Sequence, residues 1–413
     1  MNKFRSTACN KNIFWKFHRK ITFVYSTIVR ENIMTDLKAI VKWPGGKISE
    51  SEKILPLLPH FNGRFIDPFV GGGAIYFASQ ARKAAINDLS DELISLYRFI
   101  QMGNKNFFSS ILHLDHIRQS LSSALDNDIA NLLTLFDDFI SEDISKAELK
   151  YEVESLVGNK KNHYSNYTLK QIEANVFLQE TSKNLTRKLI RMQSLSIENG
   201  KLNHEDIIKN LQTAMHSAFY MYVRHLYNFA DEINLSDTEN IATFYYMREF
   251  CYSSMFRFNK DRKFNVPYGG MAYNSKDFSS KISRIQQLKY KEYLERTEIY
   301  NEDFSVFFEK IVPSKEDFIF LDPPYDSDFS TYDGNSFDKK DHERLAAFMR
   351  NTSAKFMMVI KDTDFIRELF GTIPGVQKQI FDKKYMVSFQ NRNDKRAKHL
   401  IITNYPLQKQ TMF

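Results

Sequence analysis

The sequence predicts an α/β protein built on a parallel sheet, with helices on both faces and a mostly helical insertion. Short apolar runs alternate with helical patterns near both ends of the chain, whereas long polar helical stretches fill the middle. The 413 residues exceed a typical domain of roughly 100 to 200 residues. We therefore expect one sheet assembled from both ends of the chain and interrupted by a second, helical region.

The first part of the sheet is expected between Val41 and Tyr97. An apolar run at 65–70 meets three glycines at 71–73, and a second run at 84–86 ends at Asn87 and Asp88. This order predicts strand, glycine turn, helix and strand. Open α/β sheets bind ligands at the carboxyl ends of their strands, so the glycine turn is a candidate binding position and Asp88 is suited to ribose hydroxyls.

Strands are expected to return after Thr297. The candidates are 299–300, 318–321, 355–360 and 400–403, with a helix over 339–350. In the intervening region one set of apolar side chains recurs every three or four residues and predicts a core-facing helix side: Ile208, Leu211, Met215, Ala218, Tyr222 and Leu226.

The expected organisation follows from these patterns. An N-terminal extension covers 1–38, and the α/β domain combines 39–97 with 297–413. The helical insertion covers 98–296 and includes a hairpin near 252–271, which is rich in turn residues and basic groups. Whether translation starts at Met1 or at Met34 is left open.

Composition narrows the class of protein. The formal net charge of +7 fits a surface that binds a polyanion, although basic residues also simply solubilise a surface. Cys9 and Cys251 are far apart, which supports neither a disulfide framework nor a metal site.

No run of about 18 apolar residues predicts a membrane span, so a cytoplasmic protein is expected. The glycine turn lacks GxGxxG and GxxxxGK[ST], which disfavours a nicotinamide-dependent oxidoreductase and nucleotide-triphosphate binding.

The most specific element is Asp322-Pro323-Pro324-Tyr325, directly after an apolar run. Two consecutive prolines fix the backbone and donate no hydrogen bonds, so the Asp322 carboxylate and the Pro323 carbonyl remain as acceptors. Two such acceptors match the two hydrogens of an amine, and Tyr325 could stack on an aromatic ring. No covalent enzyme intermediate is needed.

Four motifs together resemble the Dam-type, or alpha-class, DNA adenine-N6 methyltransferases. They are Lys42 to Lys47, Asp67 to Gly73, Asn301 to Phe304, and Asp322 to Tyr325, in that order. The resemblance covers about 39–97 and 220–405. It implies a Rossmann-like methyltransferase sheet, S-adenosylmethionine as methyl donor, double-stranded DNA as partner, and attack by the N6 amine of a flipped adenine.

The resemblance also implies roles for single residues. In the cofactor site, Lys47 would lie near the methionine carboxylate, Asp88 would bind the ribose, and Asp303 would accept from the adenine amine. The full set of expected cofactor contacts is Trp43, Lys47, Asp67, Phe69, Gly71, Gly73, Asp88, Asp303, Phe304 and Asp322. The expected catalytic residues are Asp322, Pro323, Pro324 and Tyr325.

The hairpin near 252–271 would read DNA. Arg257 matches an arginine that reads guanine in relatives, because a guanidinium fits guanine O6 and N7. The other expected DNA contacts are a wedge at Tyr252, apolar base contacts at Met255 and Pro267, a phosphate contact at Asn259, and Lys42. Gly270-Met271 and Ser253 depart from relatives that read GATC, so the target sequence stays open.

Other interpretations remain at this point. Cytosine-N4 methylation is the nearest, although serine is commoner than aspartate at position 322 in cytosine enzymes. RNA or protein-amide methylation is weaker, and a catalytically inactive DNA-binding protein of the same fold is another class. A cognate restriction endonuclease as partner, the oligomeric state, and the role of the helical block at 98–219 are left open.

Overall fold

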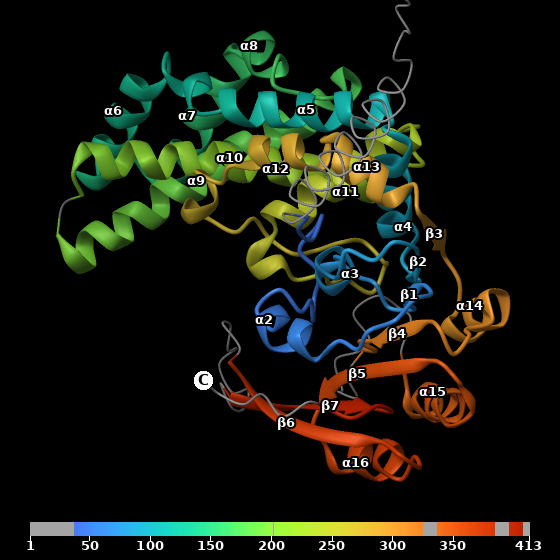
Figure 1. Ribbon diagram of the computed structural model, residues 1–413. Coiled ribbons are helices and arrows are strands. Elements are labelled where there is room, and N and C mark those ends of the chain that lie inside the picture. Colours follow the sequence, from blue (N-terminus) through green and yellow to red (C-terminus); the bar gives the residue numbers. More distant parts are fainter. Residues whose placement is uncertain (1–36, 201, 325–336, 385–395, 408–413) are drawn as a thin grey trace, which may run out of the picture.

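The sheet at the centre of the molecule has seven strands in the order β3-β2-β1-β4-β5-β7-β6. The computed structural model describes residues 37–200, 202–324, 337–384 and 396–407 (Figure 1). The strands are β1 Phe65–Asp67, β2 Ala84–Asn87, β3 Thr297–Tyr300, β4 Phe318–Leu321, β5 Lys355–Lys361, β6 Gln377–Lys384 and β7 Arg396–Thr403. The first five are mutually parallel, and β7 runs antiparallel to both β5 and β6.

Both ends of the chain contribute adjacent strands. In the middle of the sheet Phe65 of β1 pairs with Ala84 of β2 on one side and with Phe318 of β4 on the other. The expectation of one α/β sheet assembled from both ends of the chain is therefore confirmed. Because these strands are parallel, their carboxyl ends all lie at one edge of the sheet.

Helices cover both faces. Alternate strand residues point to opposite sides, so Ile66, Ile319 and Phe356 pack with α14 Phe304–Ile311, α15 Lys339–Asn351 and α16 Asp364–Gly371. Phe65, Phe318 and Met357 belong to the other core, which continues into the helices that follow β1 and β2. Those nearest the sheet are α3 Ala74–Ser79, α4 Asp91–Met102 and α13 Leu288–Leu294.

A large helical block lies beyond that second face and follows β2 in the chain (Figure 1). Its helices are α5 Lys105–Ser120, α6 Ile129–Ile140, α7 Lys146–Asn159, α8 Lys161–Ser165, α9 Ala174–Asn199, α10 His204–Asn228, α11 Asp237–Phe250 and α12 Phe278–Ile285. The expected apolar side of α10 is buried at five of its six positions, and Ile208 is only half-buried. The small element α2 Ser51–Ile54 lies beside α3.

Two details of the sheet differ from the expectation. The run expected as a strand over 65–70 pairs only through Asp67, because Pro68 has no N–H and Phe69 N–H instead donates to Asp67 Oδ1 at 3.1 Å. The edge strand β6 was not expected at all, because its side chains are largely exposed and show no apolar alternation. The expected extension at 1–38 lies almost entirely outside the described residues.

Candidate active site

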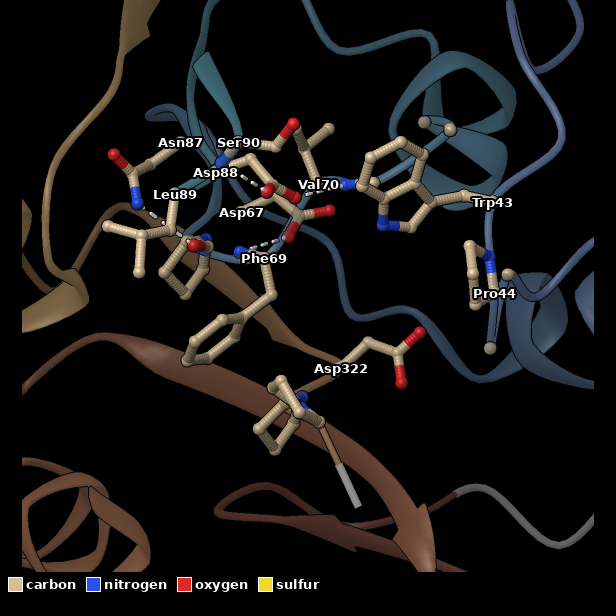
Figure 2. A pocket seen from close by; sticks show the side chains of 18 of the residues that line it. Trp43, Pro44, Asp67, Phe69, Val70, Asn87, Asp88, Leu89, Ser90 and Asp322 are labelled. Atoms are coloured by element: carbon tan, nitrogen blue, oxygen red, sulfur yellow. Dashed lines mark hydrogen bonds between the residues drawn. The ribbon is translucent and has the colours of Figure 1, made fainter. Parts of the chain in front are cut away.

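A cavity of about 1190 Å³ opens at the carboxyl ends of β1, β2 and β4. All ten residues expected to contact the cofactor line it, together with Pro323 and Pro324. Figure 2 shows Trp43 on one side of this space, with the Asp67 and Asp322 carboxylates directed into it. Tyr325, the remaining expected catalytic residue, lies outside the described residues.

The glycine turn after β1 is shaped by close packing. Gly71 has φ +51°, and a Cβ there would lie 2.7 Å from the Trp43 ring. Gly73 has φ +75°, and its Cβ would lie 2.5 Å from the Tyr97 hydroxyl, which donates to Gly71 O at 3.0 Å. Only glycine fits at both positions, so the turn can lie directly beneath the indole of Trp43.

Asp88, just after β2, holds this turn in place. Its carboxylate accepts from Gly71 N–H at 3.0 Å and from Ser90 N–H at 3.1 Å. Asn87, the last residue of β2, donates to Pro68 O at 3.1 Å and to Glu302 O at 3.0 Å, which joins the ends of three strands. Each Asp88 oxygen therefore accepts one backbone hydrogen bond. The ribose contact expected for Asp88 stays a prediction.

The cavity brings three carboxyl groups together, those of Asp67, Asp88 and Asp322. Asp67 is 2% exposed, and its burial raises the pKa of the carboxyl well above its ordinary value, with Asp322 and Asp88 adding to the effect. Burial likewise raises the pKa of Asp88. A bound cation would favour the ionised form of these carboxyl groups and would oppose the rise in their pKa.

Lys47 forms an ion pair with Asp322 at the end of β4. Its side chain is 1% exposed, and Nζ donates to Asp322 Oδ1 and to Gly45 O, the latter at 2.9 Å. The Lys47 ammonium therefore holds one oxygen of the Asp322 side chain in place. Contact between Lys47 and the methionine carboxylate of a cofactor stays a prediction.

The other end of the cavity is built around Asp303 and Phe304. Asp303 caps α14 through Ser305 N–H at 2.9 Å, and Arg344 of α15 donates to both of its oxygens at 2.9 Å. These donors lower the pKa of Asp303 to about 2. The Arg344 guanidinium also lies 4.5 Å from the centre of the Phe304 ring, and Phe69 packs on the same ring.

Two of these residues escaped the sequence analysis. Arg344 lies on a helix with no motif around it, and only the fold brings it to Asp303. Tyr97 stood at the border of the expected domain, and its hydroxyl supports Gly71 from a distance of 26 residues along the chain. The position of Asn87 beside Asp88 at a strand end could have been recognised as part of the site.

A hairpin follows α11 and lies next to the cavity. Tyr252 N–H donates to Pro267 O at 2.8 Å, and Asn265 N–H donates to Arg257 O at 3.1 Å. Its buried side packs Phe256, Phe258 and Phe264 against each other. Phe256, Phe258, Asn259 and Arg262 also line the cavity, so the tip of the hairpin borders the same space as the strand ends.

The residues expected to contact DNA are mostly accessible. Arg257, Tyr252 and Pro267 are exposed, and Arg257 Nε donates to Asn265 Oδ1 at 2.9 Å. Asn259 Oδ1 accepts from two N–H groups of the turn, so its oxygen has a structural role. Met255 is half-buried.

Lys42 reaches a buried acid on α11. Its Nζ lies 3.6 Å from Glu249, which is 6% exposed and also pairs with Lys276 and Lys281. These lysines lower the pKa of Glu249 despite its burial. The Lys42 side chain is itself half-exposed, so its ammonium pairs with Glu249 and still faces solvent.

A largely parallel sheet with helices on both faces and a cavity at the carboxyl ends of its strands defines the class of fold, which is Rossmann-like α/β. Within the described ranges, no group of three or more His, Cys, Asp or Glu side chains could hold a metal ion. The family model of the D12 class N6 adenine-specific DNA methyltransferases matches residues 43–125 and 178–389. The chain belongs to this family and is an adenine-specific DNA methyltransferase.

Individual relatives agree with this assignment. The chain is 27% identical over 374 residues to the type II methyltransferase M.CviBI of Paramecium bursaria Chlorella virus NC1A, covering 89% of this chain and 100% of that protein. It is 24% identical to the type II methyltransferase M.MjaIII of Methanocaldococcus jannaschii, over 90% and 100% of the two chains. A retron Ec67 DNA adenine methylase of Escherichia coli is 30% identical over 37% of this chain and 50% of its own length.

Membership of this family favours methylation of adenine over cytosine, and an enzyme over an inactive DNA-binding protein.

The described part of the chain contains no helix with both the length and the apolar composition to cross a membrane.

Proposed function

We propose that the chain transfers the methyl group of S-adenosylmethionine to the N6 amine of an adenine flipped out of double-stranded DNA, by direct in-line attack. The observation that carries this proposal is the position of Asp322, which directly follows β4 and lines a cavity together with the buried Asp67 and the half-buried Asp88. S-adenosylmethionine carries a sulfonium and an ammonium group, and either cation would favour the ionised form of these carboxyl groups when the donor binds.

The adenine amine is a weak nucleophile, because its lone pair is delocalised into the ring. Asp322 and the carbonyl of Pro323 would accept its two hydrogens and turn the nitrogen toward tetrahedral geometry. The N6 lone pair then forms the new N–C bond while the C–S bond breaks and its electron pair stays on sulfur. One N6 proton leaves toward Asp322 or solvent. Lys47 would hold the carboxylate in place throughout.

The remaining contacts complete the proposal. Asp67, Asp88 and the glycine turn would hold the methionine and ribose parts, and Asp303 and Phe304 the adenine ring of the cofactor. Tyr325 would stack on the flipped base. The hairpin and Lys42 would bind the duplex, and residues 98–296 would form the insertion that includes this target-recognition element. A restriction endonuclease acting on the same site is proposed as a partner.

The proposal is tested by modification-sensitive sequencing of DNA from a host that expresses the chain. We expect N6-methyladenine at one position of a short recurrent sequence. Purified protein with a methyl-labelled donor and the same duplex then shows whether the label reaches adenine. Label on cytosine alone, or on no base, would contradict the proposal.

Asp322→Ala tests the catalytic residue. Loss of one hydrogen-bond acceptor at the reacting atom is expected to lower the methylation rate by about 10²-fold or more, because such interactions act mainly in the transition state. Duplex binding, measured by fluorescence anisotropy, should persist.

Glu302→Gln is the matched control for this change. Glu302 lines the same cavity but pairs with Lys310 at the surface. Its variant should methylate near the rate of the parent. An Asp322→Ala enzyme within about tenfold of the parent, a barrier change of only about 1.4 kcal/mol, would contradict the assigned role.

A further inference from the structure

Arg248, near the end of α11, is a completely buried guanidinium between two aromatic rings. It is 0% exposed, and its guanidinium carbon lies 5.0 Å from the ring centre of Trp43 and 4.5 Å from that of Phe256. Burying a cation is costly unless its surroundings stabilise it, and π-faces do so. Sequence analysis gave this residue no role.

The two rings belong to different functional elements. Trp43 lies on the loop that borders the donor cavity, and Phe256 lies on the first arm of the hairpin and lines the same cavity. Arg248 also bonds the backbone next to each ring, with Nη2 donating to Lys42 O at 2.7 Å and Nη1 to Met255 O at 3.5 Å. One side chain therefore fixes both the ring and the main chain of each element.

Trp43 connects Arg248 to the donor cavity. Its indole lies against Gly71 so closely that a methyl group on that glycine would not fit. A ligand along the glycine turn would thus restrict the indole, and the indole in turn contacts the guanidinium. The path from Gly71 through Trp43 to Phe256 contains packed side chains at every step: the two rings lie with their centroids 6.1 Å apart, and the Arg248 guanidinium lies over both of them.

We propose that Arg248 couples occupation of the methyl-donor pocket to the placement of the DNA-reading hairpin. This inference rests on the proposed function and adds a positioning residue to it. Coupling of this kind is reciprocal: donor bound at Trp43 strengthens DNA binding by the same factor by which DNA strengthens donor binding. A purely structural role for Arg248 would weaken both bindings and leave that factor unchanged.

The chain offers its own reporter for the test. It has two tryptophans, Trp15 and Trp43, so Trp15→Phe leaves Trp43 as the single indole. In that background the fluorescence of Trp43 is followed while S-adenosylhomocysteine is added. The titration is done once without DNA and once with a saturating, unmethylated duplex that contains the sequence the enzyme recognises. The ratio of the two dissociation constants is the coupling factor.

Arg248→Lys retains the positive charge but loses the planar guanidinium, which contacts two rings and donates to two carbonyl groups. We expect the coupling factor to fall from roughly tenfold toward one. S-adenosylhomocysteine binding without DNA should change less than this. Phe256→Leu, which removes the ring on the hairpin side, should produce the same loss and provides a second test if Arg248→Lys folds poorly.

Arg224→Lys is the matched control. Arg224 lies on α10 and donates to Val266 O, on the second arm of the hairpin, at 3.3 Å. This variant should keep the coupling factor of the parent. An unchanged factor in folded Arg248→Lys, or a parent that binds S-adenosylhomocysteine equally with and without DNA, overturns the inference even when the parent methylates DNA. Failure of the proposed function itself is seen separately, as unlabelled adenine.

Discussion

At the scale of single residues, the site combines groups that would each be unfavourable alone. Asp67 is buried at a strand end beside Asp322 and Asp88, and its pKa is raised by burial first and by these neighbours second. Local conflicts of this kind are expected at functional sites, where binding a ligand relieves them. Stability of the free protein and affinity for a cationic ligand should therefore oppose each other at this position.

Asp67→Asn is expected to stabilise the ligand-free protein at neutral pH by about 1 kcal/mol. Above the ordinary aspartate pKa of 3.8 the unfolded chain has lost this proton while the folded carboxyl keeps it, so the folded state loses stability as the pH rises toward the raised pKa. Urea unfolding at pH 5 and pH 7.5 should show the advantage of the variant increasing with pH. Its affinity for S-adenosylmethionine should fall.

Asp317→Asn provides the opposite case. Asp317 accepts from Arg64 at the other end of β4, and these bonds help to lower its pKa. A lowered pKa stabilises the protein above the ordinary value, and that stability is lost as the pH falls. The control variant should therefore be less stable than the parent, by a constant amount from pH 5 to pH 7.5. If Asp67→Asn behaved in the same way, the charge conflict at Asp67 would be refuted.

Much of the site could be predicted from residues that follow strands. Asp67, Asp88 and Asp322 come directly at or after apolar runs, and parallel strands bring such positions to one edge. Arg248 and Arg344 could not be found in this way. Each acts through partners far along the chain, and a helical arginine has no local pattern that distinguishes a buried role from an exposed one.

At the scale of elements, the hairpin has a packed side and an exposed side. Phe256, Phe258 and Phe264 fill the packed side, whereas Arg257 lies between the first two in sequence and is exposed. This alternation was visible in the sequence. The strand β6 was not, because an edge strand with exposed side chains has no apolar pattern to reveal it.

Arg257→Ala is expected to relax discrimination at one guanine of the target, with a cost of roughly 1 to 3 kcal/mol on the preferred sequence. Competition binding with single-base variants of the duplex measures this. Arg262→Ala, at the exposed hairpin turn, serves as the control. Any loss of DNA binding in this variant should be the same for every duplex sequence. Equal weakening on every sequence by Arg257→Ala would show instead that Arg257 contacts phosphate.

At the scale of the whole molecule, the cavity joins two distant parts of the chain. β1 and β2 supply Asp67 and Asp88, and β4 supplies Asp322 more than 230 residues later. The helical block lies between these parts in sequence and packs on one face of the sheet through α4 and α13 (Figure 1). A ligand in the cavity therefore contacts both halves of the sheet at once.

Ligand binding should thus stabilise the sheet as a unit. At S-adenosylhomocysteine concentrations near 100 times the dissociation constant, the free energy of unfolding should rise by about 2.7 kcal/mol. Hydrogen exchange should slow in both β1 and β4. Protection confined to one of these strands would show that the ligand does not bridge them.

The pairing of β1 with β4 also determines when activity can first arise during synthesis. A ribosome must translate the whole helical block and then Phe318–Leu321 before the strand that completes the pocket exists. Domains generally fold as units as they emerge. Prematurely terminated products that end within the block therefore lack Asp322 and the other cavity residues from Glu302 onward, so under the proposed function such fragments cannot methylate DNA.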